Sequence, residues 1–140
     1  MTPIPIPVVA AVLLRGDEVL VTRRKRGGHL AGKWEFPGGK IEKGERPQAA
    51  LRREILEELG CRIAVGKRMC RVSYQYAEKS VRLDFYRCRL VQGKPQSMEG
   101  QKVRWIRKDS LGSLAFPPAD RKILALLQVG KGASLRRQPS

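Results

Sequence analysis

The stretch from Gly39 to Cys61 constrains this chain more than any other, because it gathers acidic side chains in a protein that is otherwise strongly basic. The sequence predicts a helix from Pro47 to Leu59. Pro47 suits the first turn, where its missing N–H is no loss, and Gly60 suits the left-handed position just past a helix end. The question is what the acids on this helix are for.

Three glutamates of the predicted helix, Glu54, Glu57 and Glu58, stand at positions i, i+3 and i+4. Their carboxylates therefore share one face, where three like charges repel one another unless a cation lies among them. A hard divalent ion with oxygen ligands, Mg²⁺ or Mn²⁺, meets that need. Glu45 adds a fourth acid at the helix entrance. The alternative, a solvated acidic face, is disfavoured by the double glycine at Gly38, whose turn can aim carbonyl oxygens at the same ion.

The opposite face of the helix is expected to pack on a core. Leu51, Ile55 and Leu59 form an apolar stripe, with Leu56 at its edge. Arg52 falls inside this stripe, and the prediction requires its aliphatic stem to lie along the core while the charge reaches water.

The spacing of Gly39, five residues, Glu45, seven residues and then REILEELGC resembles the Nudix box. Only Cys61 departs, standing where the family usually has an aliphatic residue, and a small apolar thiol is a mild change. The resemblance marks Gly39, Glu45 and Gly60 as structural positions of the box. It implies the Nudix α/β/α sandwich around a central mixed β-sheet, and metal-dependent hydrolysis of nucleoside diphosphates linked to another group.

Two further segments closely resemble the MutT branch of that family: HLAGKWEFPGGKIE, which begins at His29, and FPPA, which begins at Phe116. MutT-like enzymes are nucleoside triphosphate pyrophosphohydrolases that convert 8-oxo-dGTP to the monophosphate and pyrophosphate. This reaction removes the oxidised nucleotide from the nucleotide pool. Close relatives take CTP or methylated dCTP, which is the alternative here. A Nudix hydrolase of nucleotide sugars or dinucleotides, and a basic nucleic-acid-binding module without turnover, also stay open.

The resemblance assigns roles to individual residues. The metal ligands it implies are the Gly38 carbonyl, Glu54, Glu57, Glu58 and Glu99, with Mg²⁺ as the expected ion. The catalytic residues it implies are Glu54, Glu57, Glu58, Glu99 and Arg53. Water is expected to attack the β-phosphorus with Glu54 or Glu99 as base, while Arg53 orients Glu45 or Glu54. The substrate-binding residues it implies are Arg24, His29, Glu35, Phe36 and Asp120.

Asp120 stands where the MutT pattern has asparagine. Asparagine can donate to O6 and accept from the N7–H of 8-oxoguanine, whereas an ionised carboxylate only accepts. An ionised Asp120 suits the N–H groups of a guanine edge or the exocyclic amine of cytosine. A buried, protonated Asp120 can imitate asparagine, with its pKa shifted upward. Alternatively, Asp120 merely caps the final helix.

Length and charge set the remaining expectations. The 140 residues predict one domain, 1–130, and a basic, flexible tail, 131–140. No apolar run can span a membrane, no signal peptide is evident, and three cysteines without paired spacing indicate reduced, buried thiols in a cytoplasmic monomer or homodimer. The net charge of +16 suits attraction of a polyanionic nucleoside triphosphate, and nucleic acid is an unlikely partner because no nucleic-acid module is present.

Apolar runs and alternation place the other elements around the acidic helix. Predicted strands are Val8–Leu14, Val19–Thr22, Trp34–Phe36, Arg62–Val65, Met69–Tyr76, Val81–Val91 and Val103–Ile106, with a turn at Pro37–Gly39. A second amphipathic helix is predicted at Pro118–Val129, carrying Ile123, Leu126 and Leu127. Strands on both sides of a central helix favour an α/β fold with a mixed sheet.

Overall fold

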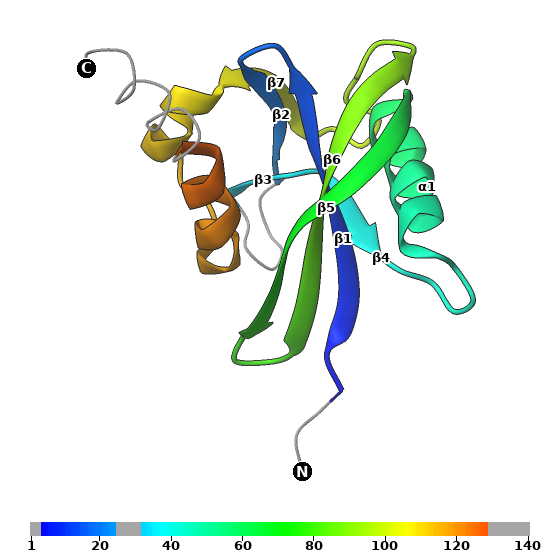
Figure 1. Cartoon of the computed structure of the whole chain (residues 1–140), viewed down its shortest axis with the longest axis vertical. Coiled ribbons are helices and arrows are strands. Elements are labelled where there is room, and N and C mark those ends of the chain that lie inside the picture. The colour runs from blue at the N-terminus through cyan, green and yellow to red at the C-terminus, as the bar shows by residue number, and fades with distance from the viewer. Residues whose placement is uncertain (1–3, 25–31, 129–140) are drawn as a thin grey trace.

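A mixed sheet separates two helices, α1 (Pro47–Leu59) on one face and residues 121–128 on the other (Figure 1). The computed structural model describes residues 4–24 and 32–128. The predicted α/β sandwich around a central sheet is therefore confirmed. The expected tail at 131–140 and residue His29 lie outside the described residues, and the domain boundary stays a prediction.

Seven strands form the sheet: β1 (Ile6–Arg15), β2 (Glu18–Arg23), β3 (Trp34–Glu35), β4 (Gly38–Lys40), β5 (Arg62–Gln75), β6 (Ser80–Gln92) and β7 (Lys102–Arg107). Their order is β3-β2-β1-β6-β5, with β4 paired to β1 and β7 paired to β2. β1 and β6 run parallel, and the other pairs are antiparallel. This combination confirms the predicted mixed sheet.

The continuous apolar run in β1 is explained by burial on both faces of the sheet. Val9, Ala11 and Leu13 pack with α1 in one core cluster. Ala10 and Val12 point the other way, into a second cluster closed by the C-terminal helix. Because side chains alternate along a strand, a run covered on both faces reads as uninterrupted apolar sequence.

Helix α1 has the predicted bounds and ends. Gly60 takes a left-handed φ of 66° and donates its N–H to the Leu56 carbonyl at 3.0 Å. The predicted stripe of Leu51, Ile55 and Leu59 is fully buried, and Leu56 at its edge is 40% exposed. Arg52 is exposed, so this cation does not interrupt the core.

The predicted C-terminal helix needs two corrections. The segment Pro118–Asp120 is a 3₁₀ turn, and the α-helix begins only at residue 121. Another 3₁₀ helix, Lys108–Ser113, comes earlier in the chain. Ile123 and Leu127 are buried as expected, but Leu126 is 43% exposed because the helix turns it away from the sheet. Val129 lies outside the described residues.

Two strand predictions also require correction. The predicted strands Arg62–Val65 and Met69–Tyr76 belong to one strand, β5, which ends at Gln75, one residue before the predicted end. Its pairing with β6 is interrupted by bulges that absorb extra residues. The expected turn at Pro37–Gly39 is instead the start of β4, which pairs with β1. Gly38 is required there, since a Cβ would collide with the Val9 backbone.

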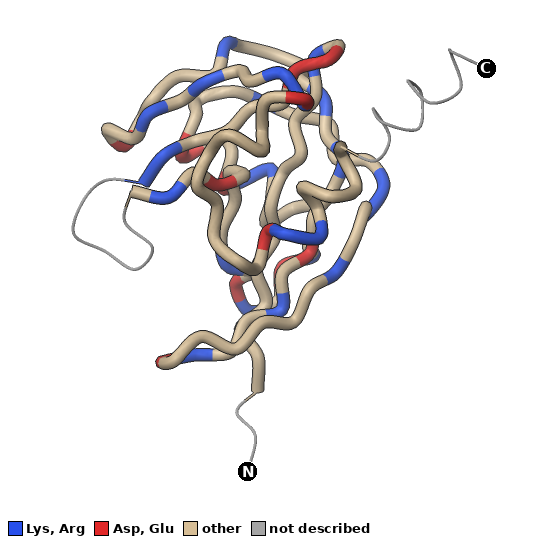
Figure 2. The backbone as a smooth tube through the Cα atoms, turned by 90° about the vertical axis from the view of Figure 1, so that its left-hand side faces the viewer, with Lys and Arg blue, Asp and Glu red and all other residues tan. Residues whose placement is uncertain are grey.

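The distribution of charge, the cysteines and the helix lengths can each be compared with the sequence predictions. Lys and Arg positions are spread along most of the described backbone, and acidic positions are far fewer (Figure 2). Cys61, Cys70 and Cys88 are buried and free, as predicted. Within residues 4–24 and 32–128, no helix has the length and apolarity needed to cross a membrane.

Candidate active site

Helix α1 and strand β4 bring the acidic cluster against the sheet. Glu54 points from α1 toward β4, and a Cβ placed on Gly39 would collide with the Glu54 carboxylate. A side chain at position 39 would displace the Glu54 carboxylate from its place against the strand. The glycine of the box and its first helical glutamate are therefore parts of one packing contact.

Glu54 and Glu58 lie close enough on α1 for each carboxyl group to affect the pKa of the other. Burial, followed by the charge of Glu54 and the bond with it, raises the pKa of Glu58 to about 9. The pKa of Glu54 is also raised, chiefly by burial. Two carboxyl groups packed this closely keep a proton that water would remove at neutral pH.

The third helical acid, Glu57, lies at the edge of the cluster. Its side chain is 55% exposed, and its Oε1 lies 3.3 Å from Nη1 of Arg53. Across 4–24 and 32–128, no three His, Cys, Asp or Glu side chains yet surround one point as a formed metal centre. The donors nevertheless fit a hard divalent ion, because Glu54 and Glu58 bring carboxylate oxygens close together, and a bound cation would add to Arg53 in offsetting their repulsion.

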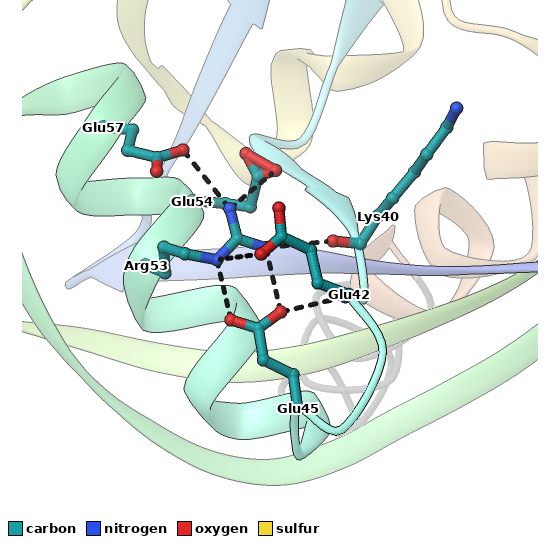
Figure 3. Close-up of polar contacts among 6 residues, drawn as sticks. All are labelled: Lys40, Glu42, Glu45, Arg53, Glu54 and Glu57. Atoms are coloured by element: carbon teal, nitrogen blue, oxygen red, sulfur yellow. Dashed lines mark hydrogen bonds and ion pairs between the residues drawn. The ribbon is translucent and has the colours of Figure 1, made fainter.

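Arg53 ties the loop before α1 to the acidic face (Figure 3). Its Nε and Nη2 donate to the two carboxylate oxygens of Glu45 at 2.7 and 2.9 Å, and Nη2 also donates to the Lys40 carbonyl at 3.2 Å. Glu45 in turn accepts the Glu42 N–H at 2.9 Å. These bonds, the one from Arg53 first, lower the pKa of Glu45 to about 2.

The same guanidinium reaches the catalytic candidates. Nη1 of Arg53 lies 3.3 Å from a Glu57 oxygen and 3.6 Å from a Glu54 oxygen. The planar group therefore contacts Glu45 on one side and the acidic face on the other. This places Arg53 where the sequence predicts an orienting role, between Glu45 and Glu54.

Glu99 comes to the cluster from outside the box. It lies on the loop that joins β6 to β7, and its charge helps raise the pKa of both Glu54 and Glu58. Its side chain is exposed, while its backbone N–H donates to Oε1 of Gln101 at 3.0 Å. The structure thus brings Glu99 toward the helical acids, as the sequence predicts.

A cavity of about 280 Å³ opens on the side of the sheet that faces away from α1. Gly38, Gly39 and Lys40 line the cavity, and Gly39 also lies against the Glu54 carboxylate. Asp120 and Tyr76 line the same cavity. Gly39 therefore contacts Glu54 and also lines the cavity.

The polar groups of the cavity centre on Asp120, which is 5% exposed. Burial, then the charge of Glu35, raises its pKa to about 7, while Arg24 opposes the shift. Arg24 pairs with Glu35 at 3.0 Å. Burial nevertheless raises the pKa of Glu35, with Arg24 acting in the opposite direction.

Aromatic rings supply the flat surfaces of the cavity. Phe36 stacks on Phe116 with centroids 5.4 Å apart and meets Phe85 edge to face at 5.8 Å. Tyr76 and Lys79 also line the cavity, although no motif in the sequence pointed to them. The only available signal was the position of Tyr76 near the end of a predicted strand.

Comparison with known proteins gives the same family from independent evidence. The NUDIX domain family model matches residues 8–126. The 8-oxo-dGTP diphosphatase of Escherichia coli K12 is 34% identical over 122 residues, 86% of this chain and 95% of that protein. The CTP pyrophosphohydrolase of the same strain is 32% identical over 119 residues, 85% and 88% of the two chains.

The fold agrees with a solved structure as well. The crystal structure of the MutT protein from Methanosarcina mazei Go1 matches with a TM-score of 0.78 and 26% identity, over 91% of this chain and 96% of that one. The mixed sheet with helices agrees with this match. The chain therefore belongs to the family of Nudix hydrolases.

Proposed function

We propose that the chain hydrolyses 8-oxo-dGTP, in a Mg²⁺-dependent reaction, to the nucleoside monophosphate and pyrophosphate. The observation that carries this proposal is the shared wall at Gly39, with the Glu54 carboxylate on one side and the cavity on the other. A base held in the cavity places its phosphate chain at the acidic cluster. The relatives named 8-oxo-dGTP diphosphatase, matched over most of both chains, support the same substrate class.

The side chains have the parts that this reaction needs. Glu54, Glu57, Glu58 and Glu99 would hold Mg²⁺, which when bound neutralises phosphate oxygens and lowers the pKa of water. Glu54 or Glu99 takes the proton of the water whose oxygen bonds to the β-phosphorus. The bond from that phosphorus to the α–β bridging oxygen breaks, and the nucleoside monophosphate leaves. Lys40, which lines the cavity and whose carbonyl accepts a bond from Arg53, supplies a cation for the phosphates.

Asp120 is the residue proposed to recognise the base. Burial raises its pKa to about 7, so that both the protonated and the ionised form are accessible near neutral pH. The protonated carboxyl offers one donor and one acceptor, as an asparagine amide does, and so suits O6 and N7–H of 8-oxoguanine. Phe36 provides an apolar surface beside it.

A second substrate class, CTP or 5-methyl-dCTP, is favoured by the ionised form of Asp120. The ionised carboxylate accepts a hydrogen bond from the exocyclic amine of cytosine. The similarity to CTP pyrophosphohydrolase supports this alternative. The two substrates differ in the protonation state of Asp120 that they require.

A turnover screen with Mg²⁺ tests the proposal. The substrates are 8-oxo-dGTP, dGTP, CTP, 5-methyl-dCTP and a nucleotide sugar, and the products are read separately as pyrophosphate and monophosphate. We expect pyrophosphate from 8-oxo-dGTP, and its loss in Glu57→Gln. Monophosphate from the nucleotide sugar, without pyrophosphate from any triphosphate, contradicts the proposal. So does salt-sensitive nucleic-acid binding without any turnover.

A further inference from the structure

The loop between β6 and β7, residues 93–101, caps the C-terminal end of α1 (Figure 1). The last carbonyls of a helix have no partner inside the helix. Here the Leu59 carbonyl accepts the Gln96 N–H at 2.9 Å, and the Glu58 carbonyl accepts the Met98 N–H at 3.1 Å. The backbone of the loop is thus fixed to the turn that carries Glu58.

One side chain, Gln101, adds a second link at the same place. Its Nε2 donates to the Glu58 carbonyl at 3.0 Å. Its Oε1 accepts the Glu99 N–H at 3.0 Å and the Ser97 hydroxyl at 2.9 Å. A carbonyl can only accept and a backbone N–H can only donate, so these partners determine which end of the amide faces which group.

The loop around Glu99 has few other features that would hold this residue in place. The loop has left-handed glycines at Gly93 and Gly100, with φ of 86° and 79°, and Met98 is 57% exposed. Exposed loop segments with few apolar contacts open at low free energy. The amide of Gln101 is bonded both to the backbone of Glu99 and to the helical turn of Glu58, and so fixes the distance between them.

We propose that Gln101 is a positioning residue that holds Glu99 within reach of the divalent ion bound by Glu54 and Glu58. The effect on turnover rests on the proposed function, whereas the effect on metal binding does not. Outer partners that orient metal ligands typically contribute about 10- to 100-fold to metal affinity or activity. Gln101 is half-buried and neutral, so it acts through hydrogen bonds rather than charge.

Mn²⁺ binding, measured by the electron paramagnetic resonance signal of the free ion, tests this directly. We expect Gln101→Ala to raise the Kd for Mn²⁺ about 10-fold. Gln96→Ala is the matched control, because it removes the same amide from the same loop while its bond to Leu59 comes from the backbone. Its Kd should equal that of the unaltered protein. An unchanged Kd in Gln101→Ala overturns the inference.

A double-mutant cycle separates positioning of Glu99 from a general structural role. If Gln101 acts through Glu99, Gln101→Ala changes the Kd less than about 2-fold in a Glu99→Gln background. A full additional loss in that background overturns the inference. Gln101→Met keeps the unbranched stem without the hydrogen bonds, and serves if the alanine variant does not fold. It should show the same loss of Mn²⁺ affinity.

Turnover then distinguishes this inference from the proposed function. If the unaltered protein binds Mn²⁺ but releases no pyrophosphate from any triphosphate, the proposed function fails, and the Mn²⁺ cycle still decides the role of Gln101. If pyrophosphate is released normally and Gln101→Ala binds Mn²⁺ as tightly as the control, the positioning role fails and the proposed function stands.

Discussion

The two sides of the sheet each hold a carboxyl group whose pKa is raised first by burial, but the two groups differ in the charges around them. On the α1 side, burial and neighbouring acids act together on Glu58, whose pKa rises to about 9. In the cavity on the other side, burial and Glu35 raise the pKa of Asp120 only to about 7, because Arg24 opposes them. The acidic cluster around Glu58 would be stabilised by a bound cation. In the cavity, the carboxyl group of Asp120 can gain or lose its proton near neutral pH.

The largest effect should come from Glu58→Gln on the α1 side. Loss of this carboxylate should lower kcat/KM by about 1000-fold or more, which is about 4 kcal/mol of transition-state stabilisation. The metal-free variant should also unfold at a higher temperature, by a few degrees, since repulsion between the packed acids is relieved. Steady-state kinetics and a thermal melt in EDTA check both.

The comparison between the two sides requires that Glu58→Gln leave base preference unchanged. The ratio of kcat/KM for 8-oxo-dGTP and CTP, measured at high enzyme concentration, should stay within about 2-fold of the unaltered protein. A large change in this ratio would mean that the acidic cluster also reads the base.

Arg53→Lys should give the next largest effect. A lysine cannot make the two parallel bonds to Glu45 and the contact to the Lys40 carbonyl at once. We expect kcat to fall about 10- to 100-fold with little change in KM, because the loop and the acids lose their common orienting group. Initial rates over a range of substrate concentrations give kcat and KM separately. A change confined to KM would mean that Arg53 contacts the substrate instead of orienting the acids.

Asp120→Asn, in the cavity, should change selectivity rather than rate. The amide is a donor and an acceptor at every pH, so preference for 8-oxo-dGTP over CTP should rise about 10-fold at pH 8, where Asp120 is mostly ionised. In the unaltered protein this preference should fall as pH rises through about 7, and in the variant it should not. Equal kcat/KM ratios in the two proteins across that range would remove Asp120 from base recognition.

Sequence reasoning succeeded best on the α1 side because one contiguous segment builds it. Pro47 and Gly60 predicted the bounds of α1 and its left-handed end, and the spacing of apolar residues predicted its buried stripe. The link of Arg53 to Glu45 was also anticipated. The function of Gly39 was less visible, since its need for glycine comes from the Glu54 carboxylate across the helix–strand contact.

The cavity side was harder to predict because distant segments build it. Tyr76 and Lys79 follow β5, and Asp120 precedes the last helix, so only the fold brings them together. The sequence showed that Asp120 replaces an asparagine, but not how much it is buried. The pKa of Asp120 depends on that burial and on the opposing charges of Glu35 and Arg24.

The smallest effect should come from changing that balance with Glu35→Gln. Removing the Glu35 charge withdraws a cause that raises the pKa of Asp120, while the charge of Arg24, which lowers that pKa, is kept. Other groups facing the cavity are Tyr76 and Lys79, with Cys70 close to Asp120. The midpoint of the selectivity change should therefore move down by up to about one pH unit. A ¹³C NMR titration of the Asp120 carboxyl gives the same pKa without turnover, and an upward shift would show that Glu35 does not act through its charge.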